Sequence, residues 1–369
     1  MTYLDHGATS FPKPREVTGA MIRAMETCGN PGRGGYDAAM RGARTVLQCR
    51  EWAGELFDCE PEQVLCTASC THGLNIAIRT LVKPGSRVVI SGFEHNAVMR
   101  PLHALGAKIT VAGRKLFDRE DTLREFEAAL RKGVDAAVFT HVSNVFGYIL
   151  PAQKLAELCR RYHVPFAVDC AQSAGVLPIS LKNWGADFIA MPGHKGLLGP
   201  MGTGLLLCGR VPEPLLFGGT GSLSKDYRMP VFLPDVGEAG TVNVPGIAGL
   251  AAGIEQVCRD TPEKILMREQ REMLRTAKRM EKLGYRVFCG DNQCGTISFV
   301  PQCGCEELAE ALGKQMVCVR AGLHCAPLAH ESAGTLDTGT VRISFGHNAN
   351  PSQTANLIFA LERLQNFQG

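Results

Sequence analysis

The chain has 369 residues, of which 45% are hydrophobic and 20% are charged, the composition of an ordinary globular protein with one large or two medium domains. Lysine and arginine number 39 and aspartate and glutamate 36, and this near balance gives no reason to expect a nucleic acid or a membrane surface as partner. No apolar run approaches the roughly 20 residues of a membrane span, no secretion signal is visible, and the 15 scattered cysteines fit buried thiols in a reducing cytoplasm.

Short β-branched runs alternate with helical patterns between about residues 60 and 210. Strands are predicted at residues 64–66, 87–91, 108–112, 136–142, 166–169, 187–191 and 204–208, and helices at residues 71–81, 95–105, 119–131 and 151–162. This alternation predicts an α/β fold with a mostly parallel sheet that helices cover on both faces. In such a sheet the ligand site lies at the carboxyl ends of the strands.

The pattern changes after about residue 240 and predicts a smaller α+β domain. This part contains a helical stretch at 247–282 that breaks near Pro262, strands at 286–289, 296–300, 316–320 and 340–345, and helices at 306–314 and 351–364. We expect a large domain at residues 15–245 and a small domain formed by residues 1–14 and 246–369.

One lysine stands in an unusual setting. Lys195 follows the apolar run 187–191 and precedes the glycine-rich segment 199–204. A lysine at the end of a buried strand is well placed to form a Schiff base with pyridoxal phosphate (PLP). His194 is expected to position cofactor or substrate, or simply to cap the loop. The alternative for Lys195 is an ordinary solvated loop lysine.

A PLP site also needs a carboxylate that keeps the pyridine nitrogen protonated. Asp169 ends the predicted strand 166–169, where a buried charge is unusual without a function. Gln172, three residues further on, is expected to donate to the phenolic oxygen of the cofactor. The alternative is that Asp169 only caps the following turn.

Two further segments complete a possible cofactor site. Residues 67–75 follow a strand and open a helix, and a helix N-terminus favours a phosphate, which we place at Thr71 and His72. Thr71 as a plain helix N-cap is the alternative, and the two roles are compatible. His95 follows the strand 87–91 and is expected to stack on the pyridine ring.

The order and separations of these segments resemble those of class V aminotransferase-type PLP enzymes of fold type I, specifically the cysteine desulfurase and selenocysteine lyase group. The resemblance covers essentially the whole chain and rests on residues 3–9, 94–95, 141–147, 168–172, 193–195 and 238–241. It implies a large domain with a seven-stranded sheet and a smaller C-terminal domain. It also implies that Asn144 contacts the cofactor and the substrate carboxylate. Thr241 would reach the phosphate of the partner subunit's PLP, which implies a homodimer with shared active sites.

Residues 320–327 are similar to the R-x-G-x-H-C-A segment of the second, short-loop group of cysteine desulfurases. The resemblance implies that Cys325 attacks the sulfur of the substrate and keeps it as a persulfide. Gly322 and the small residues after position 325 suit a mobile loop, and His324 is expected to help ionise the neighbouring thiol. The alternative for Cys325 is a buried cysteine at a strand end.

An amino-acid substrate needs an arginine for its α-carboxylate. Arg342 matches the family's carboxylate-binding arginine, and Arg320 is a second match near the same substrate. The alternative for Arg342 is a strand arginine that is paired at the surface.

The chain departs from the family pattern at three places. Pro192 stands where relatives have a hydroxyl residue that binds the phosphate, so we expect Thr203 or Ser222 to supply that contact. His72 stands where relatives have a glutamate. Residues 329–335 are predicted to form a slightly long polar loop.

These features favour a PLP-dependent cysteine desulfurase that converts L-cysteine to L-alanine, uses Lys195 also as acid and base, and passes sulfur to an acceptor protein. Selenocysteine lyase is a close alternative. Another lyase, racemase or aminotransferase of the same fold, in which Cys325 is dispensable, is the next. A metal or iron–sulfur protein would use Cys303, Cys305 and Cys318, whose spacing matches no standard pattern.

Overall fold

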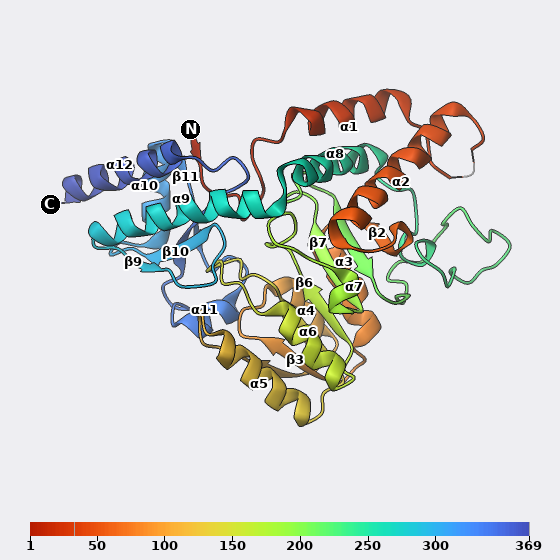
Figure 1. Cartoon of the computed structure of the whole chain (residues 1–369), viewed down its shortest axis with the longest axis horizontal. Helices are drawn as coiled ribbons and strands as arrows, with labels where there is room; N and C mark the ends of the chain where they lie inside the picture. The colour runs from red at the N-terminus through yellow and green to blue at the C-terminus, as the bar shows by residue number, and fades with distance from the viewer. Residues whose placement is uncertain (33, 369) are drawn as a thin grey trace.

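A seven-stranded sheet forms the centre of the computed structural model, which describes residues 1–32 and 34–368 (Figure 1). The strand order is β2-β8-β7-β6-β5-β3-β4. These strands are β2 (Val64–Thr67), β3 (Arg87–Ser91), β4 (Lys108–Ala112), β5 (Ala136–Thr140), β6 (Phe166–Asp169), β7 (Phe188–Pro192) and β8 (Gly204–Cys208). β8 runs antiparallel to both of its neighbours, and the other pairs are parallel. The predicted mostly parallel α/β sheet is confirmed.

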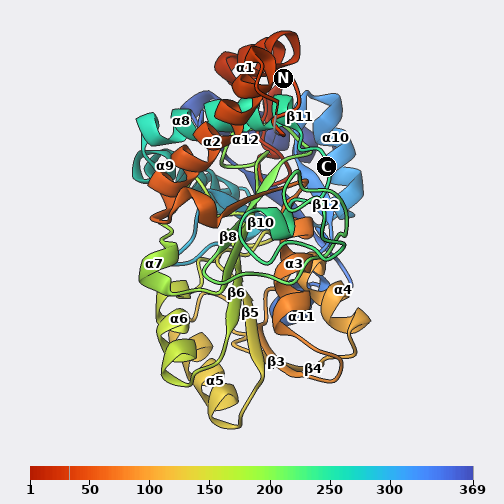
Figure 2. The same cartoon turned by 90° about the vertical axis from the view of Figure 1, so that its right-hand side faces the viewer.

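Helices cover both faces of this sheet (Figure 2). α3 (Cys70–Leu81) and α4 (Asn96–Ala104) pack on one face, and α5 (Arg119–Arg131), α6 (Ala152–Arg161) and α7 (Leu181–Trp184) pack on the other. Successive residues of a strand point to opposite faces, so Ile189 and Met191 join one core while Phe188 and Ala190 join the other. This two-sided burial explains why the central strands are continuous apolar runs.

The structure has two helices before residue 60 that the apolar pattern does not predict. α1 (Arg15–Thr27) and α2 (Asp37–Phe57) pack against α8 (Val244–Asp260). Glycine allows α8 to approach α1 closely, since a Cβ on Gly249 would lie 2.7 Å from Cγ of Met21. Within the pair, a Cβ on Gly42 of α2 would lie 2.5 Å from the Gly29 carbonyl in the connection between α1 and α2. The buried face of α2 combines small residues with Val46, Cys49 and Phe57.

The C-terminal part of the chain builds a four-stranded antiparallel sheet in the order β12-β13-β10-β9. Its elements are α9 (Pro262–Lys282), β9 (Arg286–Phe288), β10 (Thr296–Val300), α10 (Cys305–Lys314), β12 (Arg320–Gly322), β13 (Thr340–Ser344) and α12 (Pro351–Gln368). α8 and α9 meet at Thr261, so the helix break expected near Pro262 is present. Across the described residues, no helix is both long and apolar enough to cross a membrane.

Two predictions for the C-terminal part are wrong. The single strand predicted at 316–320 is two strands, because β11 (Val317–Cys318) pairs with β1 (Thr2–Tyr3) whereas β12 pairs with β13. The polar loop predicted at 329–335 is largely a helix, α11 (Pro327–Ala333). Proline at the first helical position, a left-handed glycine cap at Gly334 and burial of three side chains stabilise α11.

Candidate functional site

Residues 193–197 form a turn directly after β7, which we call the lysine turn. Backbone approaches on both sides of it are too close for side chains: a Cβ on Gly193 would lie 2.2 Å from the Thr203 hydroxyl, and one on Gly196 would lie 2.2 Å from the Ala174 carbonyl. The turn therefore holds the half-buried Lys195 in one position. Burial lowers the pKa of Lys195, and the positive charge of Arg342 lowers it further.

Asp169 ends β6, beside the strand that carries the lysine, and its side chain is only 3% exposed. Its Oδ1 accepts hydrogen bonds from the Ala171 N–H at 2.8 Å and from the Cys70 thiol at 3.5 Å. The first of these bonds is the turn cap considered as an alternative, and it leaves Oδ2 for another donor. The sequence pattern does not single out Cys70, whose thiol reaches Asp169 only because α3 begins there.

His95 lies at the start of α4, where its Nδ1 accepts from the Ala97 N–H at 3.0 Å. Burial is the main cause that lowers the pKa of His95, while the charge of Asp169 acts in the opposite direction and that of Lys195 adds to the lowering. The three side chains therefore share one electrostatic neighbourhood. Glu94 beside them is fully buried and accepts from Ser91 and from the Thr140 N–H at 2.9 Å, which ties the ends of β3 and β5 together.

The N-terminus of α3 differs in detail from the prediction. Ser69 is the N-cap and accepts from the His72 N–H at 3.1 Å, so the reading of Thr71 as N-cap is wrong. The helix instead begins at Cys70, and Thr71 lies exposed in its first turn. His72 Nδ1 accepts from the Ala68 N–H at 3.3 Å. The first turn of α3 thus presents Thr71 and backbone N–H groups, the setting that favours a phosphate.

The N-terminal segment holds the lysine turn from outside. The His194 carbonyl accepts from the Ser10 N–H at 3.0 Å, from the Thr9 hydroxyl at 3.0 Å and from Lys13 Nζ at 2.7 Å. The His194 ring does not cap the loop, because its Nδ1 is buried and has no partner among the described residues. Burial lowers the pKa of His194 to about 4, so this ring is neutral near pH 7. Gln172 donates to the Gly7 carbonyl at 3.0 Å and belongs to the same junction.

The two candidates for the hydroxyl missing at Pro192 lie in different places. Thr203 is 2% exposed and packs against the lysine turn, with its hydroxyl donating to the Pro200 carbonyl at 2.7 Å. Ser222 donates to Asp235 in a largely exposed segment. Of the two, the structure brings Thr203 to the turn.

The two candidate arginines share one carboxylate that the sequence pattern does not single out. Arg342 binds Oδ1 of Asp5 at 2.8 Å, and Arg320 binds Oδ2 at 2.8 Å. Arg342 is 2% exposed, so its reading as a surface pair is wrong, whereas Arg320 is half-exposed. Arg342 also donates to the Asn144 carbonyl at 2.9 Å, and its buried Nε has no partner among the described residues. Two guanidinium groups and one carboxylate leave one net positive charge for an anion.

Cys325 is exposed and lies in a tight turn over residues 323–326, closed by a 2.9 Å bond from the Ala326 N–H to the Leu323 carbonyl. His324 and Cys325 have φ values of 50° and 56°, so two successive non-glycine residues are left-handed. The Asn96 N–H donates to the Cys325 carbonyl at 2.8 Å, and Asn144 Nδ2 donates to the His324 carbonyl at 2.8 Å. The turn is thus hydrogen-bonded to Asn144 and to Asn96, which follows His95. The Cys325 thiol is exposed, so the alternative of a buried cysteine is wrong.

The His324 ring does not help to ionise the thiol beside it. Its Nε2 lies 3.2 Å from both the carbonyl and the hydroxyl of Thr340, and its ring stacks on His330 at 5.8 Å. Burial, followed by the charge of Arg342, lowers the pKa of His324 to about 3. The ring is therefore neutral near pH 7 and supplies no positive charge, so this prediction is wrong. The mobility expected for the Cys325 loop stays a prediction, and the structure adds that the segment beyond it is helical from Pro327 and that the Ala326 side chain is fully buried.

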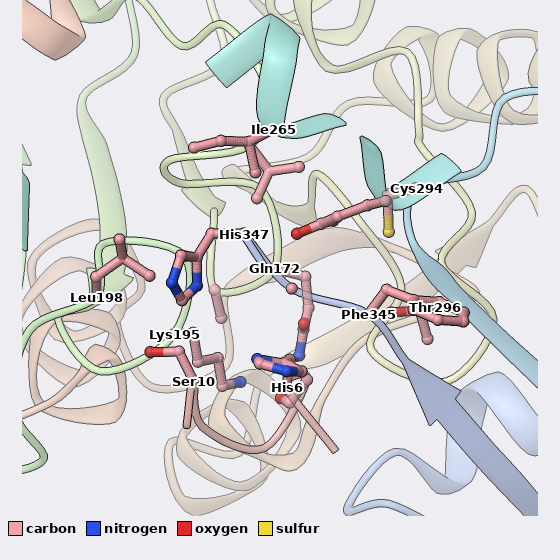
Figure 3. A pocket seen from close by; sticks show the side chains of 16 residues that line it. His6, Ser10, Gln172, Lys195, Leu198, Ile265, Cys294, Thr296, Phe345 and His347 are labelled. Atoms are coloured by element: carbon pink, nitrogen blue, oxygen red, sulfur yellow. Dashed lines mark hydrogen bonds between the residues drawn. The ribbon is translucent and has the colours of Figure 1, made fainter. Parts of the chain in front are cut away.

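Thr241 lies outside this neighbourhood. It is exposed and lines a cavity with Arg50 and Glu238, which form a salt bridge at 2.6 Å. Glu238 also accepts from the Cys66 N–H at 2.7 Å, so β2 fixes the segment before Thr241. Lys195 lines a different cavity, together with His6, Gln172 and His347 (Figure 3).

Comparison with known proteins gives consistent matches over the whole chain. Residues 2–357 match the family model described as aminotransferase class-V. The chain is 31% identical to a probable cysteine desulfurase of Methanothermobacter thermautotrophicus, over 96% of this chain and 92% of that protein. It is 30% identical to a probable cysteine desulfurase of Pyrococcus abyssi, over 98% and 94% respectively. Among solved structures, the apo structure of a cysteine desulfurase from Thermococcus onnurineus NA1 matches with a TM-score of 0.90 and 28% identity, over 98% of this chain and 94% of that chain.

Proposed function

The chain belongs to the class-V aminotransferase family, and from that premise we propose that it is a PLP-dependent cysteine desulfurase that converts L-cysteine to L-alanine. Relatives that match it almost end to end are named probable cysteine desulfurases. One observation carries the proposal: the turn of Cys325 is hydrogen-bonded to Asn96, beside His95, and to Asn144. This docking supports a role for the Cys325 thiol in a reaction on a molecule that is bound near Lys195.

The polar atoms around Lys195 fit the groups of PLP. Asp169 keeps Oδ2 for a ring nitrogen, and buried atoms of Asn144 and His194 lack protein partners among the described residues. The residues that would hold the cofactor are Lys195, Asp169, Gln172, His95, Thr71, His72, Asn144 and His194, with the partner subunit's Thr241 at the phosphate. When bound, PLP supplies the electron sink that makes bonds at the substrate's carbon atoms labile.

Binding and proton transfer follow from the side chains near Lys195. The free Nε of Arg342 and the net positive charge shared with Arg320 and Asp5 would bind the substrate carboxylate. Lys195 Nζ would take the α-proton of the amino acid, because burial lowers its pKa and raises the fraction of neutral amine. The same Nζ would return a proton to carbon later in the cycle.

Cys325 would perform the sulfur transfer. Its thiolate attacks the sulfur of the substrate, an S–S bond forms, and the C–S bond breaks with its electron pair left on carbon. A proton from Lys195 Nζ then completes the methyl group of alanine, and the sulfur remains on Cys325 as a persulfide. The exposed position of Cys325 would let an acceptor protein take this sulfur.

The test is Cys325→Ser with bound PLP and L-cysteine. We expect no L-alanine above background and no added sulfur atom on the chain by mass spectrometry, while Cys28→Ser, a change at a partly exposed cysteine, keeps both signals. Full alanine production by Cys325→Ser would contradict the proposal. Retained activity of Cys325→Ser on another amino acid would instead favour a lyase, racemase or aminotransferase.

Selenocysteine is the closest alternative substrate, and comparing kcat/KM for the two amino acids separates a desulfurase from a selenocysteine lyase. For the metal-protein alternative, the described residues contain no group of three or more His, Cys, Asp or Glu placed to hold a metal ion. Cys305 instead donates to the Thr338 carbonyl.

A further inference from the structure

Two arginines lie directly opposite each other in the four-stranded sheet. Arg320 of β12 and Arg342 of β13 are register partners in an antiparallel pair. Side chains at opposite positions share one face of a sheet, and like charges placed in this way repel each other. Arg342 is only 2% exposed, so water does little to screen this repulsion. The pair therefore requires a negatively charged group between its guanidinium groups.

Asp5 is this negatively charged group. Its Oδ2 accepts from Nε and Nη2 of Arg320 at 3.0 and 2.8 Å, and its Oδ1 accepts from Nη2 of Arg342 at 2.8 Å. The backbone of Asp5 is itself fixed, because it forms a parallel bridge with Ser344 and its carbonyl accepts from the Tyr3 hydroxyl at 3.1 Å. The edge of Arg320 formed by Nε and Nη2, which could bind a carboxylate through two hydrogen bonds, is thus already occupied.

Arg342, in contrast, keeps one donor for a ligand. Its Nη1 donates to the Asn144 carbonyl at 2.9 Å and its Nη2 donates to Asp5, whereas its Nε is buried and has no partner in the part of the chain that the structure describes. Gly7 lies against the guanidinium, since a Cβ there would be 3.2 Å from Cζ of Arg342. A buried N–H group without an acceptor is costly, so this Nε is suited to an oxygen of a bound molecule.

The cluster of Asp5, Arg320 and Arg342 adjoins the lysine amine and the thiol turn. Burial is the main cause that lowers the pKa of Lys195, and among the nearby charges that of Arg342 lowers it further whereas that of Asp5 raises it. Asn144, which accepts from Arg342, also donates to a carbonyl of the turn that carries the thiol. A molecule bound to Arg342 Nε therefore lies close to both reactive groups.

We propose that Asp5 determines which acids this site accepts: by holding both arginines and cancelling one of their two charges, it selects amino acids with a single carboxylate over those with a second acidic group. This inference rests on the proposed function, because it names the substrate class of the same site. One α-carboxylate neutralises the net positive charge that the cluster retains. A second acidic group finds no further positive charge in the cluster and is repelled by the Asp5 carboxylate.

Asp5 is thus a positioning residue, since Arg342 is the member of the cluster that contacts the substrate. Asp5→Asn raises the net charge of the cluster by one unit, which attracts an acid with two charges more strongly than an acid with one. Loosening of the arginines weakens the binding of both acids alike, so the ratio of their affinities isolates the effect of the charge. We expect this ratio to change about tenfold, as an added unit charge at roughly 6–8 Å would produce.

The primary test uses the PLP-free full chain and two simple acids, propionate with one carboxylate and succinate with two. Their dissociation constants are measured by NMR titration of the Arg342 Nε–H signal in a chain with labelled arginine, and Arg342→Lys assigns this signal. We expect Asp5→Asn to raise the ratio of the propionate Kd to the succinate Kd about tenfold. The matched control is Asp121→Asn, which removes another buried aspartate that pairs with Lys115 and Arg124 and is expected to leave the ratio unchanged.

Arg320→Gln makes the opposite change in charge. It removes one positive charge at a half-exposed position and is expected to lower the same ratio about tenfold, and combining it with Asp5→Asn should restore the wild-type ratio. Arg320→Gln serves as the readout if Asp5→Asn does not fold. Equal ratios in the wild type and in the folded variants would overturn the proposal, and so would an Arg342 signal that neither acid shifts.

A second readout uses the holoenzyme, with L-cysteine as substrate and L-aspartate as competitor. We expect the ratio of the L-aspartate Ki to the L-cysteine KM to fall about tenfold in Asp5→Asn and to stay constant in Asp121→Asn. A merely structural role of Asp5 would change Ki and KM in equal proportion, and that result would count against the selection of acids by charge. Because the titration with propionate and succinate needs neither PLP nor L-cysteine, the expected ratios in an enzyme without desulfurase activity would contradict the proposed function alone.

Discussion

The Cys70 thiol determines how the Asp169 carboxylate is presented. Asp169 Oδ1 accepts from this thiol and from the Ala171 N–H, so the carboxylate is held at one oxygen and open at the other. An aspartate at a strand end is visible in the sequence, but its orientation depends on a residue about a hundred positions earlier in the chain. At the scale of single residues, what Asp169 can bind therefore depends on which of its carboxylate oxygens already accepts hydrogen bonds.

This view leads to a prediction for Cys70→Ala. Loss of the hydrogen bond from the weakly donating thiol to the carboxylate, about 0.5–1.5 kcal/mol, loosens Asp169, and we expect PLP to dissociate about 3- to 10-fold more readily. Equilibrium dialysis of PLP from the holoenzyme measures this change. Cys208→Ala, which removes another buried thiol, is the control and should retain the cofactor as the wild type does. Unchanged PLP affinity in Cys70→Ala would show that the thiol does not orient the carboxylate.

At the scale of elements, the conformation of the lysine turn depends on the absence of side chains at Gly193 and Gly196. Gly196 faces the Ala174 carbonyl so closely that any side chain must move the turn or the segment behind it. The apolar strand before the turn and the glycines within it serve one purpose, since the strand fixes where the turn begins and the glycines allow it to close.

We therefore expect Gly196→Ala to reduce PLP retention and to lower the free energy of unfolding by about 1–3 kcal/mol, the usual cost of overpacking. Urea unfolding and the visible spectrum of the purified protein measure the two effects. Gly313→Ala is the control, because a Cβ there meets no atom within 4 Å and lies in α10. That change should be neutral or stabilise by about 0.5–1 kcal/mol, so equal losses in both variants would contradict the argument.

The central strands could be predicted because strands that are buried on both faces of a sheet have continuous apolar sequences. The expected ends of β3, β4 and β6 agree with the structure. The sequence did not predict α11, because this helix is short and its polar residues resemble those of a loop. The strand at 316–320 divides because β1, some 315 residues away, pairs with half of it. Local patterns carry no information about such distant partners.

The candidate site follows the same rule. Lys195, Asp169, His95 and Arg342 were visible because each follows or occupies a strand where its residue type is unusual. The direction of the His324 ring, the bridging role of Asp5 and the cavity beside Lys195 depend on contacts between distant segments. No spacing in the sequence encodes them.

At the scale of the whole molecule, buried acids make stability depend on pH. Burial raises the pKa of Glu94 in the folded protein to about 8, compared with 4.5 for a free side chain. The folded state therefore binds the proton more tightly, so this contribution to stability is complete below about pH 4.5 and is lost as the pH rises through 8.

The prediction is made for Glu94→Gln, which keeps an acceptor for the Thr140 N–H and cannot ionise. Relative to the wild type, the free energy of unfolding of this variant should increase steadily between pH 5 and pH 8, by a few kcal/mol in total. Urea unfolding at several pH values measures the difference. A difference that stays constant over this range would mean that Glu94 is already ionised in the folded protein.

The division into a large domain at 15–245 and a small domain at 1–14 and 246–369 stays a prediction. α8, which this division gives to the small domain, packs Ile247, Leu250 and Ile254 into the core of the large sheet. Placing the boundary after α8 is the arrangement we propose for tests by limited proteolysis.

The proposed homodimer with shared sites makes a prediction of its own. Lys195→Ala and Thr241→Ala should each be impaired, but heterodimers of the two contain one site with both residues intact and should recover about half of the wild-type activity. L-alanine formation by heterodimers that are isolated after co-expression measures this recovery. Lys195→Ala with Asp169→Ala is the control, because those two residues belong to the same chain at each site and cannot complement. Recovery in neither mixture would argue against shared sites.

The contacts of the N-terminal segment affect the order in which parts of the protein fold during synthesis. Residues 2–3 pair with residues 317–318, Asp5 bridges Arg320 and Arg342, and Ser10 holds the lysine turn. Asp5 can therefore complete its contacts only after residues 315 and 337 positions later in the chain have been made. The sheet with Lys195 can form earlier in synthesis, but the Asp5 bridge between Arg320 and Arg342, where we propose that the substrate carboxylate binds, closes only after residue 342 has been made. The sheet that carries Lys195 can thus exist well before this proposed carboxylate site, so we expect the reaction on an amino acid to begin only after the C-terminal strands have folded.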